Sequence, residues 1–191
     1  MIRFLHILIF SFLFNSVQAQ QPITVVCPKG YTEIKGPWNF FNCIAPNQNV
    51  LSGSTPNFGF IKKDSSVVIT IAFIQRDSAV YKSDRELFKG LKNYDPDSVW
   101  RINFKYRVDS VNHSYMLFDK AKLKAFNADG GVEFNMNCTN LYMDNYNIAK
   151  AVTINKKYRG IVEIYYFTRE HTKTDIEKEV GNASSMVSFK K

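Results

Sequence analysis

Short segments with the hydrophobic pattern of β-strands occupy most of this chain. Residues 67–75, VVITIAFIQ, are almost continuously apolar and β-branched, which predicts a strand covered on both faces. Residues 100–108, WRINFKYRV, alternate between apolar and polar side chains, which predicts a strand with its apolar row in the core. The polar row of that segment includes Arg101, Lys105 and Arg107. We therefore expect a protein built mainly of β-sheet.

Three pairs of strand-like segments are separated by short polar runs, which predicts three β-hairpins. The pairs are 57–61 with 67–75, 149–155 with 160–167, and 120–125 (KAKLKA) with 132–138 (VEFNMNC). The last pair flanks NADGG, a run of residues that tolerate the positive φ angles of tight turns.

One helix is predicted in SDRELFKGLKN, residues 83–93. Ser83 and Glu86 have the spacing of a capping box, in which two side chains satisfy free backbone N–H groups at a helix start. A short apolar face follows the cap and consists of Leu87, Phe88 and Leu91. We expect this helix to begin at Ser83.

The charged stretch TREHTKTDIEKEV, residues 168–180, predicts a second helix rather than a reactive cluster. Thr174 and Glu177 repeat the capping-box spacing, and carboxylates at a helix start complement its dipole. One helical stripe then contains Ile176, Val180, Ala183 and Val187. His171 has no second histidine nearby, so we assign it neither a metal nor a general-base role. The predicted fold class is α+β: a mainly antiparallel sheet flanked by a few helices, with an amphipathic C-terminal helix.

The first residues have the pattern of a signal peptide. A positive charge precedes the apolar run 4–14, and Val17 and Ala19 provide the small side chains of a cleavage site. The run is shorter than the roughly 20 residues that a membrane span needs. We therefore expect removal of residues 1–19 and export of 20–191, as a single α+β domain, to the bacterial periplasm or the medium. An uncleaved N-terminal anchor is the alternative.

All three cysteines, Cys27, Cys43 and Cys138, lie in the part expected to be exported. Export permits a disulfide, and an odd number leaves one thiol over. The sequence leaves two alternatives open: Cys27 pairs with Cys43, or all three stay unpaired and buried. No Cys-x-x-Cys spacing occurs, so we expect no metal site.

Two short motifs mark the ends of the exported part. Near its start, CPKGYTEI contains Pro28-Lys29-Gly30-Tyr31, and its end reads TDIEKEVGNASSMVSFKK. The first resembles the Pro-x-Gly-aromatic turn of PsbP-like proteins, which are photosystem extrinsic subunits and bacterial relatives sharing a fold with a small Ran-binding protein. The second is similar to the terminal helix and short Ser-Phe-Lys strand of that fold. The resemblance implies an antiparallel sheet flanked by helices in a binding or assembly module without catalytic residues.

Residues for enzymatic chemistry are sparse. The exported part holds two histidines, His113 and His171, and neither a Gly-x-Ser-x-Gly elbow nor a glycine-rich phosphate loop. We therefore expect a non-catalytic binding or assembly module that uses no cofactor. The alternative is a small secreted hydrolase using Asp or Glu carboxylates, because carboxylates pair in space and one sequence hides that pairing.

Positive charge is the most informative polar feature, with 25 Lys and Arg against 17 Asp and Glu. The two predicted strands would place a basic row on the sheet, formed by Arg101, Lys105, Arg107, Lys120, Lys122 and Lys124. Such a row is either a solvated outer face or a polyanion-binding site. Because an exported protein is not expected to meet nucleic acid, the candidate partners are an acidic protein, an anionic glycan or a lipid headgroup surface.

Overall fold

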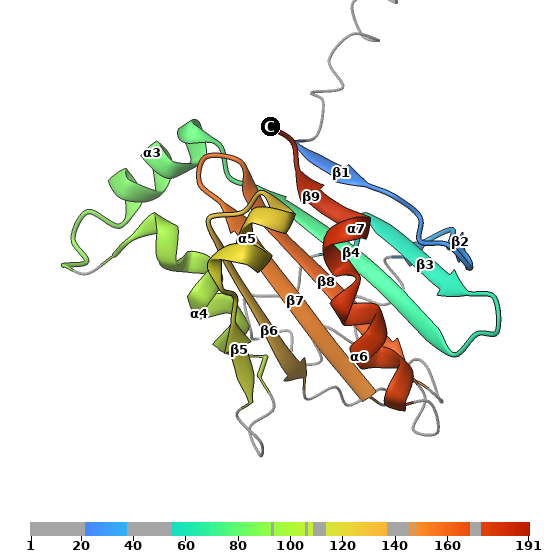
Figure 1. Ribbon diagram of the computed structural model, residues 1–191. Coiled ribbons are helices and arrows are strands. Elements are labelled where there is room, and N and C mark those ends of the chain that lie inside the picture. Colours follow the sequence, from blue (N-terminus) through green and yellow to red (C-terminus); the bar gives the residue numbers. More distant parts are fainter. Residues whose placement is uncertain are drawn as a thin grey trace, which may run out of the picture.

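The computed structural model describes residues 22–37, 55–92, 94–105, 107–108, 114–136, 146, 148–168 and 173–191. These residues form a seven-stranded antiparallel sheet in the order β2-β3-β4-β8-β7-β6-β5 (Figure 1). The predicted α+β fold with a large antiparallel sheet is confirmed. Within the described ranges, no helix has the length and apolar character needed to cross a membrane.

The strands of this sheet are short at its two edges and long in its centre. They are β2 (Tyr31–Glu33), β3 (Phe58–Lys62), β4 (Val67–Gln75), β5 (Tyr115–Leu117), β6 (Gly130–Met136), β7 (Ile148–Lys156) and β8 (Gly160–Thr168). Two further strands, β1 (Ile23–Val25) and β9 (Val187–Phe189), pair with each other outside the sheet. The two ends of the described chain therefore lie side by side.

Two of the three predicted hairpins are confirmed. β3 pairs with β4, and β7 pairs with β8 in a register that runs from Ile148 opposite Thr168 to Lys156 opposite Gly160. β4 and β8 are neighbours in the centre of the sheet, and every residue of β8 is buried. The continuous apolar pattern of β4 thus predicted a covered central strand correctly, since its first six residues are buried.

Helices cover both faces of the sheet (Figure 1). On one face, which we call the α5/α6 face, α5 (Lys120–Phe126), α6 (Lys173–Gly181), α7 (Ala183–Met186) and the β1–β9 pair enclose one apolar core. On the opposite α4 face, α4 (Val99–Lys105) buries Trp100 and Phe104 in a second core. The predicted C-terminal stripe is buried at Ile176, Val180 and Ala183, and Val187 is buried in β9 rather than in the helix.

The prediction of strands at 100–108 and 120–125 is wrong, because both segments contain helices. Trp100 and Phe104 are four residues apart and therefore share a helix face, while Arg101 and Lys105 lie exposed. α5 begins after Asp119, whose carboxylate accepts from the Lys122 backbone N–H at 2.8 Å. β6 accordingly pairs with β5 and β7 instead of with residues 120–125.

The NADGG segment is a helix end followed by a strand start, and not the predicted hairpin turn. Asn127 has φ 51° and caps α5 in the left-handed conformation, whereas neither Gly130 nor Gly131 has a positive φ. Instead, the Trp100 ring lies against Gly130 on the α4 face and the Phe118 ring against Gly131 on the opposite face. A Cβ at either glycine would clash with the ring above it. The two glycines thus make room for one aromatic ring on each face of β6.

Both predicted helices exist, but their starts differ from the prediction. α3 (Ser78–Leu87) begins before Ser83, because Asp77 accepts from the backbone N–H groups of Ala79 and Val80. Its expected apolar face is wrong, since Leu87 is 73% exposed and Leu91, beyond the helix, is 60% exposed. α6 begins at Lys173, one residue before the predicted cap.

Candidate functional site

The edge strand β5 is the least covered strand of the sheet. Its three residues are all exposed, with Tyr115 at 49%, Met116 at 54% and Leu117 at 58%. Large apolar side chains on an unpaired sheet edge mark a surface that another strand can join. The edge of β5 is therefore our candidate site.

The hydrogen-bond pattern shows which backbone groups of β5 are free. The Phe118 N–H donates to the Gly131 carbonyl at 3.0 Å, so residues 118 and 131 form a hydrogen-bonded pair. Because such pairs alternate along an antiparallel ladder, Met116 bonds to Glu133 and the main-chain groups of Tyr115 and Leu117 point outward. Within the described part of the chain, these outward groups have no backbone partner. β5 thus presents two N–H groups and two carbonyls to a further strand.

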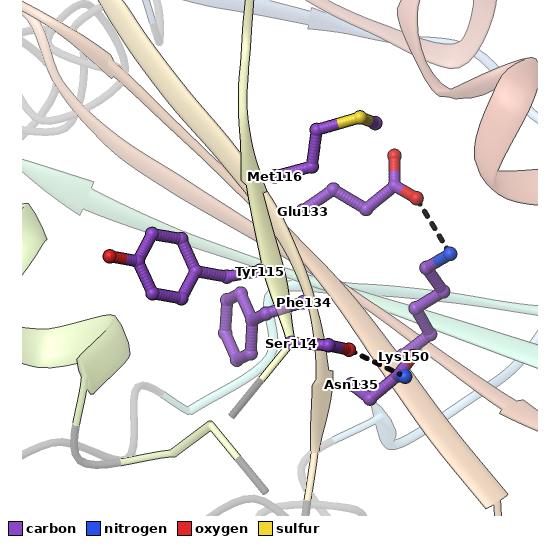
Figure 2. Close-up of a pocket in the computed structure, with 7 residues that line it drawn as sticks. All are labelled: Ser114, Tyr115, Met116, Glu133, Phe134, Asn135 and Lys150. Atoms are coloured by element: carbon purple, nitrogen blue, oxygen red, sulfur yellow. Dashed lines mark hydrogen bonds and ion pairs between the residues drawn. The ribbon is translucent and has the colours of Figure 1, made fainter. Parts of the chain in front are cut away.

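Side chains of β5 alternate between the two faces of the sheet, as Figure 2 shows. Tyr115 points to the α4 face, where its ring centroid lies 5.3 Å from that of Phe104. Met116 points to the other face, beside Glu133 on the neighbouring strand. An added strand would therefore meet an apolar side chain on each face.

A shallow cavity of about 230 Å³ adjoins β5 (Figure 2). Its lining consists of Ser114, Tyr115, Met116, Glu133, Phe134, Asn135 and Lys150. Asn135 Nδ2 donates to Ser114 Oγ at 3.2 Å across the β5–β6 pair. The cavity is smaller than the roughly 300–1,000 Å³ of typical small-molecule sites, and its size suits a side chain.

An ion-pair network forms the charged wall of this cavity. Lys150 Nζ lies 2.6 Å from Glu133 Oε1 and 2.5 Å from Glu177 Oε2 of α6, and Lys122 of α5 reaches Glu133 at 2.8 Å. Burial alone would raise the pKa of the Glu133 carboxyl, but Lys122 and Lys150 outweigh burial and hold that pKa below its ordinary value. Burial likewise acts to lower the pKa of Lys150, and Glu133 and Glu177 hold it above its ordinary value. Glu133 and Lys150 therefore both stay charged near neutral pH.

The predicted basic row does not form one face of the sheet. Arg101 and Lys105 project from α4, whereas Lys120, Lys122 and Lys124 belong to α5 on the opposite face. Both helices nevertheless border β5: Phe104 of α4 contacts Tyr115, and Lys122 of α5 pairs with Glu133 beside Met116. A helix that carries basic residues thus borders the edge strand on each face of the sheet.

Arg107 differs from the other five basic residues because it is buried. Its Nη1 lies 2.8 Å from Glu163 Oε1 of β8, and it also donates to the Tyr165 hydroxyl, which donates to Glu163 Oε2 at 2.7 Å. Burial, followed by the charge of Glu163, raises the pKa of Tyr165 well above its ordinary value. Arg101 and Lys105 are exposed, whereas Arg107 is buried and paired, so Arg107 belongs to the core and not to a binding face.

Several predicted features lie outside the described residues. These are the signal peptide at residues 1–19, Cys43, Cys138, and both histidines of the exported part, His113 and His171. Cys27 is exposed and has a free thiol, so its pairing with Cys43 is absent from the structure and stays a prediction for the exported chain. In the described ranges, no group of three or more His, Cys, Asp or Glu residues is arranged to hold a metal ion.

The sequence did not identify β5 as a site. Residues 115–117 are too few for a periodic signal, and their importance depends on their place at the end of the strand order. The sequence held one indication, which was the absence of a polar residue. A strand with one solvated face alternates between apolar and polar residues, whereas Tyr115, Met116 and Leu117 do not.

Comparisons with known proteins give a similarity of fold. Neither a family model nor a curated protein matches the sequence. The solution structure of cyanobacterial PsbP (CyanoP) from Synechocystis sp. PCC 6803 is similar, with a TM-score of 0.45 and 10% identity, over 91% of this chain and 89% of that chain. The matched protein is a PsbP, the family that the two chain ends resemble, and the likeness concerns the fold alone.

Proposed function

We propose that this protein is a non-catalytic binding module that takes an extended, acidic segment of a partner protein as an additional strand on β5. The observation that carries the proposal is the exposed apolar edge of β5, with outward main-chain groups at Tyr115 and Leu117. In strand addition, hydrogen bonds to such main-chain groups provide affinity, and adjacent pockets that accept side chains of the added strand provide specificity. On the α5/α6 face, the cavity beside Met116 is the pocket for such a side chain.

Charge supports an acidic partner over a basic one. The cations of α4 and α5 that have no carboxylate within ion-pair distance in the described residues are Arg101, Lys105, Lys120 and Lys124. Glu133 and Glu177 are already occupied by lysines. The free charge around the edge is therefore mainly positive, and it attracts carboxylates while repelling a second copy of this basic chain.

Four of the described carboxyl groups lack the raised pKa of a general acid. A general acid at neutral pH needs a raised carboxyl pKa. Hydrogen bonds from Ser66 hold the pKa of Asp64 below its ordinary value, and the pKa values of Asp77, Asp97 and Glu133 are lowered as well. These four carboxyls are thus suited to ion pairs and caps rather than to acid catalysis.

The proposed module works outside the cytoplasm after cleavage behind Ala19. Support comes from the short apolar run 4–14 and the small residues before the cleavage point. Intact mass of the exported chain should correspond to a start at Gln20 or its pyroglutamate. A chain that still begins at Met1 contradicts export by this route.

The test of the proposal compares the wild type with Leu117→Pro and Leu117→Ala as baits for proteins of the exporting cell. Proline at position 117 removes a backbone N–H that points outward and forms no hydrogen bond with β6. Edge strands tolerate proline at such positions. A partner should bind the wild type, lose most of its binding to Leu117→Pro, and lose less with Leu117→Ala. Melting temperatures confirm that each bait is folded.

The captured protein must then supply the docking segment. A synthetic peptide with the sequence of the partner's acidic extended segment should bind. The same peptide, N-methylated at alternate residues, should not bind, because it lacks the N–H groups that pair with the β5 edge. Capture of the same proteins by folded Leu117→Pro contradicts the proposal. Binding instead to heparin or to phosphatidylglycerol vesicles, unchanged by Leu117→Pro, would assign the partner to the glycan or lipid class.

A further inference from the structure

Three large apolar side chains lie exposed on α3, on α4 and on the segment between them. Leu87 at the end of α3 is 73% exposed, Leu91 in the following segment is 60% exposed, and Ile102 of α4 is 46% exposed. Leu91 and Ile102 line one cavity of about 390 Å³, so they belong to one surface. α3 itself projects beyond the end of the sheet (Figure 1). We call Leu87, Leu91 and Ile102 the apolar patch.

Other side chains hold the segment after α3 in place. The Phe88 ring packs against the Tyr94 ring with 4.5 Å between their centroids, and the Tyr94 hydroxyl donates to Asp84 of α3 at 3.0 Å. These contacts fix the segment on α3 while Leu87 and Leu91 stay exposed to solvent. Exposed apolar side chains that gather on one surface, unlike single ones, are a reason to expect a partner there.

Exposed charge on the segments that carry the apolar patch is mainly positive. In residues 82–105 the exposed cations are Lys82, Arg85, Lys89, Lys92, Arg101 and Lys105, and the exposed carboxylates are Glu86 and Asp95. Glu86 is paired with Lys89 at 2.7 Å, and Asp95 accepts the Asp97 backbone N–H at 3.0 Å. The other five cations have no carboxylate within ion-pair distance in the described residues. The charge of this surface therefore suits an anionic partner.

We propose that the apolar patch docks the protein on the surface of an anionic phospholipid bilayer. In interfacial binding, apolar side chains enter the boundary between headgroups and acyl chains, while lysine and arginine attract the anionic headgroups. The exposed leucines of the patch provide the first part, and Lys92, which lines the same cavity as Leu91, belongs to the second. A second copy of this chain is a poorer match, because it brings the same positive charge. The apolar patch shares no residue with the edge of β5, so lipid docking is independent of strand addition.

Co-sedimentation with vesicles tests the docking, using residues 20–191 because the apolar run 4–14 would itself bind lipid. At about 0.1 M NaCl, the chain should sediment with vesicles of equal parts phosphatidylglycerol and phosphatidylcholine, and not with pure phosphatidylcholine. Leu87→Ser combined with Leu91→Ser should weaken the binding at least tenfold. The matched control is Leu117→Ser on β5, where the leucine is 58% exposed, and it should leave vesicle binding unchanged.

Charge and insertion are measured separately. Lys92→Gln should weaken vesicle binding about fivefold, because one cation beside an anionic bilayer contributes about 1 kcal/mol. Lys178→Gln removes an equal charge from an exposed position of α6 and should change the binding less than Lys92→Gln does. Insertion is read from Leu91→Trp, whose fluorescence should be quenched by brominated acyl chains more strongly than that of the wild type.

Melting temperatures show whether each variant is folded, which is the expected result at exposed positions. Absence of binding to anionic vesicles overturns the proposal, and so does equal binding by the wild type and the folded double leucine variant. A dimer that dissociates in that variant, without vesicle binding, would assign the patch to a second copy. A captured protein that only that variant loses, again without vesicle binding, would assign it to a protein partner. Either of these results also overturns lipid docking, whereas loss of capture by Leu117→Pro alone concerns β5.

Discussion

β8 and β5 belong to one antiparallel sheet, but they have opposite surroundings. All nine residues of β8 are buried, including Glu163, whereas all three residues of β5 are exposed. In β8 the charge of Glu163 is matched by Arg107 and by the Tyr165 hydroxyl. In β5 no charge is present, and the apolar side chains and the outward main-chain groups remain accessible. The described residues of the chain bury β8 completely, whereas they leave β5 exposed.

The same basic segment contributes to both regions. Arg107 enters the core beneath β8, while Arg101 and Lys105, on the same segment, stay exposed on α4. Burying a charge is tolerated only when an opposite charge and hydrogen bonds replace water. The location of Glu163 thus determines which of these cations belongs to the core and which remain free for binding.

The largest expected effect is that of removing Glu163. Glu163→Ala leaves Arg107 buried without its carboxylate and should lower the free energy of unfolding by about 3–5 kcal/mol. Urea unfolding measures this loss. The double variant Arg107→Met with Glu163→Leu should recover most of it, because no uncompensated charge remains. A loss below about 1 kcal/mol for Glu163→Ala would mean that the pair is not desolvated.

The second prediction concerns the glycine that lets Phe118 pack next to β5. Gly131→Ala introduces a Cβ into the Phe118 ring and should cost about 1–3 kcal/mol through overpacking. Gly90→Ala is the matched control, since a Cβ there meets no atom within 4 Å, and its effect should stay within about 0.5 kcal/mol. Equal melting temperatures for the two variants would contradict the packing of Phe118 on Gly131.

Proline substitution at neighbouring positions tests the direction of the β5 main chain. Met116→Pro removes an inward N–H that bonds to β6, whereas Leu117→Pro removes an outward one. Met116→Pro should therefore be less stable than Leu117→Pro by about 1 kcal/mol, the net value of one hydrogen bond. Chemical unfolding gives both values. The reverse order would indicate that the two residues have exchanged directions.

An effect of similar size is pH-dependent and belongs to Glu133. Its pKa is lower in the folded chain than in the unfolded chain, so its contribution is present above the unfolded value and is lost as pH falls through the folded value. Glu133→Gln should be less stable than the wild type by about 1 kcal/mol at pH 7, and the difference should shrink below pH 4.5. A difference that is constant from pH 7 to pH 3 would argue against the ion pairs.

Patterns in the sequence predicted the centre of the sheet but not its edge. β4, β7 and β8 are apolar runs bounded by short turns. Both features can be recognised from a few consecutive residues, so the sequence predicts these strands. Residues 100–105 fit a strand and a helix equally well, because Trp100 and Phe104 share a face in either. The contact of Trp100 with Gly130 supports the helix, and no local pattern reports such a contact.

The candidate site escaped prediction for a physical reason. The basic residues were identified, but their grouping was wrong because it depended on strands that are helices. The edge position of β5 depends on strand order, and its docking capacity depends on which main-chain groups remain unpaired. Neither property can be read from residue types along a chain.

The most direct test of strand addition is amide hydrogen exchange at Tyr115, Met116 and Leu117, with and without the captured acidic segment. In the free protein, the Met116 amide should be protected by β6, while the Tyr115 and Leu117 amides should exchange rapidly. In the complex, the Tyr115 and Leu117 amides should become protected, and an N-methylated segment should leave them unprotected. A segment that binds without slowing exchange at Tyr115 and Leu117 would contradict docking on the β5 edge.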